Sequence, residues 1–203
     1  EEIFGINSRL HLAEATKIMQ KRINEKHMIN GVTIVDPDTT YISADTEIGQ
    51  DTVIFPATYI EGKNKIGKNC KIGPCAHLRG GVEIADNVKI GNFVEVKKSK
   101  IASNTNAGHL SYIGDSEVGS NVNIGAGTIT ANYNPLTKEK SKTVLKDSVK
   151  IGSNTVLVAP VTIEDGANIG ALSVITKNVP AWALAITRSP MKVLADWVRN
   201  QLK

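Results

Sequence analysis

The strongest constraint on this chain is an aliphatic residue at every sixth position over most of its length. The spacing shortens by one residue at two places and is interrupted once by a polar insertion. The members of the series are Ile42, Ile48, Ile54, Ile60, Ile66, Ile72, Leu78, Ile84, Ile90, Val96, Ile101, Ala107, Ile113, Val118, Ile124, Leu145, Ile151, Leu157, Ile163, Ile169 and Ile175. A period of six fits neither a helix nor an ordinary meander of strands. It predicts one short strand and one corner per hexad, with three hexads closing a triangular turn and stacked turns sharing one core.

The composition favours a narrow interior filled by β-branched side chains. Aromatic residues make up only 4% of the chain, whereas glycine occurs 17 times. The fifth position of most hexads is small or β-branched, which suits strands: Thr46, Thr52, Thr58, Cys70, Ala76, Val82, Val88 and Val94. We interpret the glycines that follow the aliphatic position (Gly49, Gly67, Gly73, Gly91) and the asparagines as corner residues with unusual φ. The predicted fold is an all-β parallel β-helix shaped as a triangular prism.

Helices are predicted at both ends of the prism. The first helix is predicted over residues 8–30, because its apolar residues form a stripe along one face. Ser8 is the expected N-cap, and Gly31 is expected to end the helix. A second helix is predicted to begin at Pro190, because proline suits the first helical position. The stripes consist of Leu12, Ala15, Ile18, Met19 and Ile23, and of Met191, Leu194, Trp197, Val198 and Leu202. We divide the chain into a linker helix (1–31), the prism (32–180, with a loop insertion at 131–144) and a tail with a helix (181–203).

The hexad register predicts a column of mostly small side chains on one face of the prism. The column consists of Phe93, His109, Ala126, Ser153 and Ala171. Neighbouring turns are about 4.8 Å apart, so the small residues that follow His109 leave an open slot about 14 Å long. A thin, extended ligand arm would fit this slot.

A second column places two cations next to each other at a corner of the prism. Arg79 and Lys97 are 18 residues apart in equivalent positions, and Glu95 and Tyr112 lie beside the same corner. Stacked cations repel unless an anion neutralises them, which indicates a phosphate ligand. A solvated charged face is the alternative that the pattern leaves open. Asn123 falls at a different corner, so a ligand that touches both corners would require a site shared between copies of a homo-oligomer.

His109 is the candidate general base. It points outward, has small neighbours and lies near the cationic corner. An imidazole titrates near 6.5 and can accept a proton at neutral pH. The other histidines, His11, His27 and His77, lack such a setting.

Other properties exclude several classes of protein. The net charge of +4 comes from basic residues that are scattered, whereas a nucleic-acid-binding protein clusters them. The chain has no run of about 18 apolar residues, so no membrane span is predicted. The first four residues lack the layout of a secretory signal, so a cytoplasmic protein is expected. Cys70 and Cys75 have no histidine cluster nearby, so we expect packing residues and no metal site.

Three segments resemble the acetyltransferase half of the bifunctional GlmU family. They are residues 92–98 (NFVEVKK), 108–115 (GHLSYIGD) and 121–133 (NVNIGAGTITANY). The resemblance covers nearly the whole chain, and residues 5–9 (GINSR) resemble the end of that family's uridyltransferase domain. It implies a left-handed β-helix, a homotrimer, and acetyl-CoA-dependent N-acetylation of glucosamine 1-phosphate in UDP-N-acetylglucosamine and cell-wall biosynthesis. The nucleotide-binding domain is absent, so we expect no uridylyl transfer and no role for Mg²⁺, which serves that domain.

The resemblance also assigns residues to roles. His109 is implied as the base that takes a proton from the sugar amine. The implied sugar-phosphate residues are Arg79, Lys97, Tyr112, Asn123 and a loop lysine, for which Lys140 is the better match and Lys138 the second. The implied acetyl-CoA residues are Ala126, Asn132, Tyr133, Ser153, Ala171 and Arg188. Gly80 stands where the family usually has proline, and the prism has fewer turns before Arg79.

Three other functions compete with this interpretation. A γ-type carbonic anhydrase shares the architecture but needs three histidines on zinc, and this prism offers only His77 and His109. Another hexapeptide acyltransferase, or a trimeric scaffold without catalysis, is also compatible with the repeat. Release of free thiol from acetyl-CoA distinguishes an acetyltransferase from a scaffold.

Overall fold

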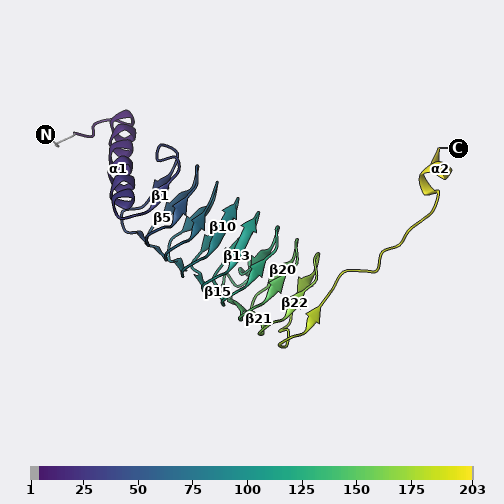
Figure 1. Cartoon of the computed structure of the whole chain (residues 1–203). Coiled ribbons are helices and arrows are strands. Elements are labelled where there is room, and N and C mark those ends of the chain that lie inside the picture. Colours follow the sequence, from purple (N-terminus) through teal and green to yellow (C-terminus); the bar gives the residue numbers. More distant parts are fainter. Residues whose placement is uncertain (1–4, 203) are drawn as a thin grey trace.

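The computed structural model shows a three-sided stack of strands with a long helix at one end and an extended tail at the other (Figure 1). It describes residues 5–202. Residues 1–4 and 203, which belong to the predicted first and last segments, lie outside the described residues.

The strands form three parallel sheets, one on each side of the prism, and successive strands along the chain pass from one sheet to the next. The nine-stranded sheet contains β1 (Thr33–Ile34), β4 (Val53–Ile54), β7 (Lys71–Ile72), β10 (Lys89–Asn92), β13 (Asn106–His109), β16 (Asn123–Ile124), β19 (Lys150–Ile151), β22 (Asn168–Ile169) and β24 (Leu184–Ala185). The eight-stranded sheet contains β2 (Tyr41–Ile42), β5 (Tyr59–Glu61), β8 (His77–Arg79), β11 (Glu95–Lys97), β14 (Tyr112–Gly114), β17 (Ile129–Ala131), β20 (Val156–Val158) and β23 (Val174–Ile175). The seven-stranded sheet contains β3 (Glu47–Ile48), β6 (Lys65–Ile66), β9 (Glu83–Ile84), β12 (Lys100–Ile101), β15 (Ser116–Val118), β18 (Thr143–Leu145) and β21 (Val161–Ile163).

The aliphatic series forms the core of the prism. Ile72, Ile90 and Ala107 are paired in register across neighbouring turns, and all three are fully buried. Burying each large aliphatic side chain contributes about 1.5–3 kcal/mol. Hydroxyl groups at the fifth positions complete the interior: Thr52 donates to the Gly67 carbonyl at 2.8 Å, and Thr105 donates to the Gly119 carbonyl at 2.8 Å. The predicted parallel β-helix is confirmed.

The corner glycines correct one part of the sequence interpretation. Asparagines do occupy corners with positive φ: Asn69, Asn87, Asn104, Asn121 and Asn154. Gly49, Gly67 and Gly91, however, have no positive φ; among the four glycines first named, only Gly73 has one, at 99°. Their backbone instead lies against the next turn, so that a Cβ on Gly49 would fall 2.7 Å from the carbonyl carbon of Gly67. Glycine is needed at these positions because there is no room for a Cβ, and not because the backbone has a positive φ.

Helix α1 (Arg9–Ile29) confirms the first predicted helix. The Ser8 hydroxyl accepts a hydrogen bond from the His11 N–H at 3.1 Å and so caps the helix. The helix contacts the prism through its C-terminal half, where Asn24 and His27 are buried. The Asn24 amide donates to the carbonyls of Pro37 and Thr40 at 2.9 and 3.0 Å.

The C-terminal segment departs from the predicted helix that begins at Pro190. The structure has only a short helix, α2 (Trp197–Gln201), and the preceding residues run away from the prism as an extended tail (Figure 1). All side chains of residues 186–202 are exposed. A short amphipathic segment without a packing partner gains too little to form a longer helix.

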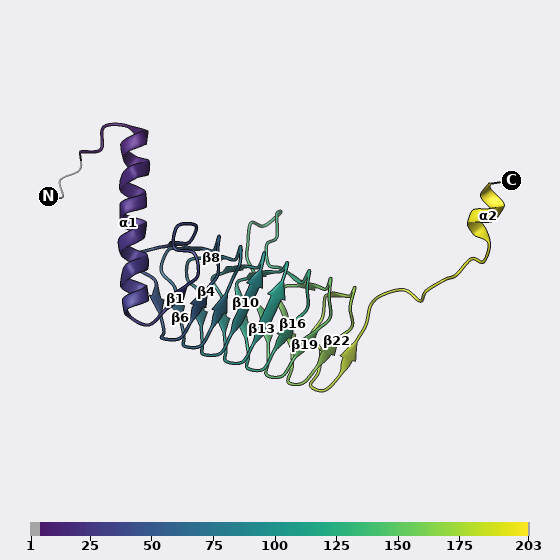
Figure 2. The same ribbon diagram turned by 45° about the horizontal axis from the view of Figure 1, so that its top comes forward.

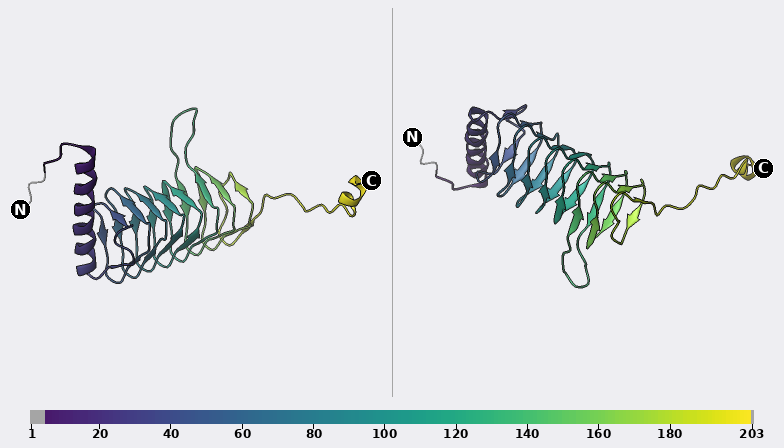
Figure 3. Two further views of the ribbon diagram at one scale, coloured as in Figure 1. Left: turned by 90° about the horizontal axis from the view of Figure 1, so that it is seen from above. Right: turned by 60° about the horizontal axis from the view of Figure 1, so that its bottom comes forward.

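The polar insertion leaves the prism between β17 and β18. In Figures 2 and 3 it projects from the stack as a narrow hairpin. Tyr133 and Lys140 form an antiparallel bridge across it. Ala131 and Thr143 belong to the flanking strands, so the projecting part, which we call the 132–142 loop, is slightly shorter than the predicted 131–144.

Candidate active site

Two cations are neighbours on the outer face of the eight-stranded sheet. Arg79 on β8 is paired in register with Lys97 on β11. The Arg79 Nη1 donates to Glu95 Oε1 at 2.9 Å, and its Nε lies 3.5 Å from Glu61 Oε1. The Glu95 carboxylate raises the pKa of the guanidinium, with a smaller effect from Glu61. Arg79 is therefore held in one orientation by two carboxylates.

The 132–142 loop brings a third cation to this place. The charges of Lys140 and then Arg79 lower the pKa of Lys97, because like charges disfavour its protonated form. Lys138 instead lies in the turn of the loop with a positive φ of 59°. We name Arg79, Lys97 and Lys140 the cation corner. The structure thus places Lys140 at the predicted site and leaves Lys138 in the loop turn.

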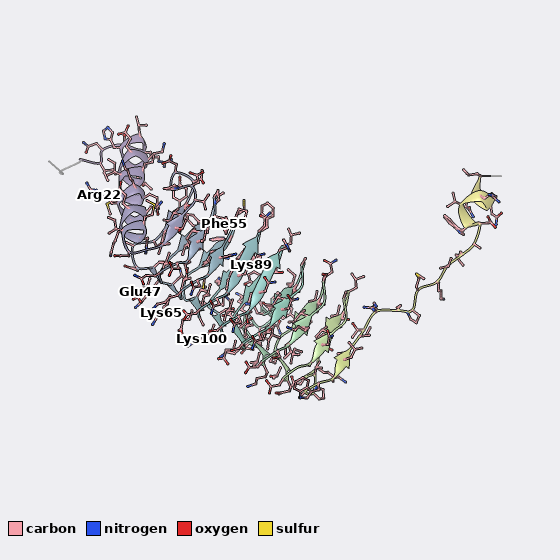
Figure 4. The ribbon with its side chains drawn as sticks, in the orientation of Figure 1. Arg22, Glu47, Phe55, Lys65, Lys89 and Lys100 are labelled. Carbon is pink, nitrogen blue, oxygen red and sulfur yellow. The ribbon has the colours of Figure 1, made fainter. Side chains whose placement is uncertain are left out.

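The seven-stranded sheet provides a comparison. Its outward column alternates in charge through Glu47, Lys65, Glu83, Lys100 and Glu117, which are paired in register. The Lys100–Glu83 distance is 3.1 Å. Figure 4 shows Glu47, Lys65 and Lys100 following one another along this side of the prism. That face alternates in sign along its whole length. At the cation corner, by contrast, Arg79 and Lys140 lie beside carboxylates, whereas Lys97 forms no ion pair within residues 5–202, which favours an anion there.

Tyr112 and Asn132 lie over Gly114 beside the cation corner. A Cβ built on Gly114 would overlap the Tyr112 hydroxyl and would lie 2.8 Å from the Asn132 Nδ2. Asn132 is buried, and its amide donates a short hydrogen bond to Asp115 Oδ2. The glycine therefore provides the space in which these two side chains meet.

The slot column lies on the nine-stranded sheet. Ala107, Ile124, Ile151 and Ile169 are paired in register, so His109, Ala126, Ser153 and Ala171, each two residues further, occupy equivalent positions. The residue preceding His109 in the column is Asn92, which is paired with it, and not Phe93 as predicted. Phe93 lies one position on, at the corner, with a positive φ of 54°.

The two ends of the slot column carry a base and a cation. The His109 side chain is exposed, and within residues 5–202 no group hydrogen-bonds its imidazole. At the other end, the Arg188 Nη1 donates to the Ala171 carbonyl at 2.8 Å. The sequence register did not predict this position for Arg188, because the residue follows the last hexad.

Two predicted site residues lie away from these clusters. Asn123 is on β16 of the nine-stranded sheet, where it accepts a hydrogen bond from the Asn106 amide at 3.4 Å. Tyr133 is exposed on the loop. Within one copy, the structure therefore brings together Arg79, Lys97, Tyr112, Asn132 and Lys140, and separately His109 with its slot.

Glu61 and Asp115 take part in the site although the sequence interpretation did not select them. Glu61 is paired in register with Arg79, and Asp115 follows Gly114, which is paired with Lys97. Both stand one turn from a selected residue, so the 17- and 18-residue spacing was the signal that could have found them.

The structure offers little for a metal site. Among the described residues, no group of three or more His, Cys, Asp or Glu side chains could hold a metal ion. His77 and His109 lie on different sheets; His77 packs edge-on against Tyr59 and lies 3.4 Å from Glu61. The Cys70 thiol is buried and donates to the Ala85 carbonyl at 3.1 Å. No helix in residues 5–202 has the length and apolar character needed to cross a bilayer.

The repeat and the fold are both found in known proteins. Residues 65–98 and 142–177 match the family described as bacterial transferase hexapeptide (six repeats). The structure is similar to that of the polySia-specific acetyltransferase NeuO, with a TM-score of 0.50 and 19% identity, over 78% of this chain and 81% of that chain. The chain thus shares the hexapeptide repeat over these two stretches, and its fold is similar to that of a known acetyltransferase.

The amino-acid sequence is also similar to those of particular bacterial proteins. The chain is 46% identical to bifunctional protein GlmU of Pseudothermotoga lettingae, over 100% of this chain and 52% of the relative. It is 50% identical to bifunctional protein GlmU of Thermoanaerobacter pseudethanolicus, over 100% of this chain and 51% of the relative. It thus spans about half the length of these relatives. The alignments run over 235 and 236 positions, so the relatives carry residues that have no counterpart among the 203 residues of this chain.

Proposed function

We propose that this chain is a glucosamine-1-phosphate N-acetyltransferase that uses acetyl-CoA. The observation that carries the proposal is the cation corner, where three positive side chains converge with Tyr112 beside the turn that bears His109. A sugar phosphate dianion matches the charge of this corner, and Arg79, held by Glu95, is oriented for it. The similarity to GlmU proteins supports the same assignment.

His109 acts as the general base in the proposed reaction. The sugar amine attacks the thioester carbonyl, and His109 accepts the proton that the nitrogen loses as the new N–C bond forms. The tetrahedral intermediate then collapses, the C–S bond breaks, and the imidazolium returns the proton to the leaving thiolate. Backbone N–H groups or an asparagine amide stabilise the oxyanion. No serine or cysteine nucleophile is required, so transfer is direct.

The slot column accommodates acetyl-CoA. Ala126, Ser153 and Ala171 leave room along the prism for a pantetheine arm whose thioester lies at His109. Arg188 ends the column and offers a cation to a phosphate of the cosubstrate. Asn132 and Tyr133, at the start of the 132–142 loop, complete the proposed binding residues.

The active form is a homotrimer with shared sites. Asn123 lies on a different sheet from the cation corner, and the proposed site takes Asn123 from a neighbouring copy. Light scattering of the purified chain is expected to give three copies. A stable monomer with full activity would overturn this arrangement.

Release of free thiol from acetyl-CoA tests the function. We expect thiol release that depends on glucosamine 1-phosphate, with formation of N-acetylglucosamine 1-phosphate. Glucosamine without the phosphate is the matched acceptor, and it should react far more slowly at low concentration. Equal rates with both acceptors would indicate another hexapeptide acyltransferase, and no thiol release with either would leave a scaffold.

A further inference from the structure

Asp115 occupies the corner at which the 132–142 loop meets the prism. It follows β14 with a positive φ of 47°, and its side chain is 20% exposed. Its N–H donates to the Lys97 carbonyl at 3.0 Å, and its carbonyl accepts from the Thr143 N–H at 3.3 Å. The backbone of this one residue therefore joins the strand that carries Lys97 to the strand in which the loop ends.

The carboxylate of Asp115 contacts the loop at two further places. Oδ2 accepts the short hydrogen bond from the Asn132 amide, and the Lys140 Nζ lies 3.9 Å from the same oxygen. Asn132 begins the loop, and Lys140 lies on its returning strand, where it bridges to Tyr133. A single half-buried charge thus fixes both strands of the loop.

The contact with Lys140 also has an electrostatic consequence. The charge of Lys140 acts on Lys97 and lowers the pKa of that lysine, and this repulsion opposes the position of the loop. The Asp115 carboxylate, 3.9 Å from the Lys140 Nζ, offsets this repulsion. Without it, the lysine would move away from the cation corner into solvent.

We propose that Asp115 is a positioning residue that couples the two substrate subsites, by holding Asn132 on the acetyl-CoA side and Lys140 on the sugar-phosphate side. This inference rests on the proposed function. The negative charge of Asp115 attracts Lys140, and the carboxylate oxygen of Asp115 accepts the hydrogen bond from Asn132. The two actions can be separated by substitution.

Asp115→Asn retains an acceptor for Asn132 and removes the charge that faces Lys140. We expect the KM for glucosamine 1-phosphate to rise roughly fivefold, the scale of a partly exposed ion pair, with the KM for acetyl-CoA unchanged. Asp115→Ala removes both actions, so both KM values should rise. In a Lys140→Ala background, Asp115→Asn should add nothing to the KM for the sugar phosphate.

Glu117→Gln is the matched control. It removes a second ion pair of the 132–142 loop, which joins Lys142 to Glu117 on β15 and is exposed. We expect both KM values to remain at the parent level. If Glu117→Gln and Asp115→Asn raise the KM for the sugar phosphate equally, or if neither does, Asp115 has no specific positioning role.

Limited trypsin digestion separates this inference from the proposed function. Asp115→Ala should accelerate cleavage after Lys138 and Lys140 relative to both the parent and Glu117→Gln, with an unchanged thermal midpoint for the prism. Faster cleavage in a chain that does not acetylate glucosamine 1-phosphate would leave the anchoring role intact and refute the function. Equal cleavage in all three proteins would refute the anchoring role.

Discussion

At the scale of single residues, His109 carries the most direct prediction. Its side chain is exposed and fills no core position, so His109→Ala should keep the thermal midpoint of the parent. The slot that follows it is unchanged, so the KM for acetyl-CoA should also persist. Loss of a general base typically lowers turnover by about 10²–10⁴-fold. Steady-state thiol release at saturating substrates measures this, and near-parent turnover would require another group to take the proton.

The two loop lysines can be distinguished by the same assay. Lys140 lowers the pKa of Lys97 and lies 3.9 Å from Asp115, whereas Lys138 lies in the loop turn. Lys140→Ala should therefore raise the KM for glucosamine 1-phosphate several-fold with turnover nearly constant. Lys138→Ala, which removes the same charge from the same loop, is the control. A larger effect from Lys138→Ala would reverse the assignment.

The residues inside the repeat could be placed from the sequence, and those outside it could not. The 17- and 18-residue spacing correctly put Arg79 beside Lys97 and His109 in line with Ala126. A count displaced by one position put Phe93 where Asn92 lies, since each step in a hexad changes where a side chain points. Lys140 and Arg188 belong to segments without the period, and only three-dimensional packing positions them.

At the scale of strands and turns, the glycine column next to the slot predicts an uneven effect on stability. A Cβ on Gly91 would overlap the Gly108 carbonyl oxygen and lie 2.6 Å from its carbonyl carbon. Backbone cannot move aside as a side chain does, so Gly91→Ala should lower the free energy of unfolding by about 1–3 kcal/mol. A Cβ on Gly108 would meet only the Asn106 Oδ1, at 3.7 Å.

Gly108→Ala is therefore the control in the next turn of the same column. It should be neutral or slightly stabilising, because alanine restricts the unfolded chain more than glycine does. Urea denaturation followed by circular dichroism compares the two variants. Equal losses would mean that the turns are not held at the observed spacing.

The contact between α1 and the prism predicts a dependence on pH. His27 is buried in this contact, and burial, together with the charge of Lys26, lowers the pKa of its imidazole from the ordinary 6.5. The folded chain therefore binds fewer protons than the unfolded chain just below pH 6.5. The free energy of unfolding should fall as the pH is lowered through 6.5 and level off below the pKa of the folded state.

His27→Gln should remove this component. Urea midpoints of the parent and of His27→Gln, measured between pH 7.5 and 5, compare the slopes. The parent should lose more stability towards acid pH than the variant. Parallel curves would show that His27 is protonated without cost in the folded chain.

At the scale of the whole molecule, much apolar surface is left uncovered by a single copy. Leu12 and Met19 of α1 are about half exposed, Phe93 and Leu110 project from one corner at positive φ, and Trp197 lies on the exposed tail. Clusters of exposed apolar side chains, such as the row on α1 and the pair at the corner, often mark interaction surfaces. The fold of the prism was predictable because its contacts are periodic, whereas the tail has no period from which its position could be predicted.

Mixing two impaired variants tests whether the site is shared between copies. Arg79→Ala and Asn123→Ala should each react slowly at a low concentration of glucosamine 1-phosphate, since each lacks one side chain of the proposed site. The two residues lie on different sheets, so a shared site takes Arg79 from one copy and Asn123 from the next. Unfolded together at equal amounts and refolded, the variants should restore about one site in four if copies mix at random in a closed ring.

The double variant refolded with either single variant is the control, because no site can then hold both side chains. Activity of the mixed singles that stays at the level of this control would place Arg79 and Asn123 in the same copy, or Asn123 outside the site.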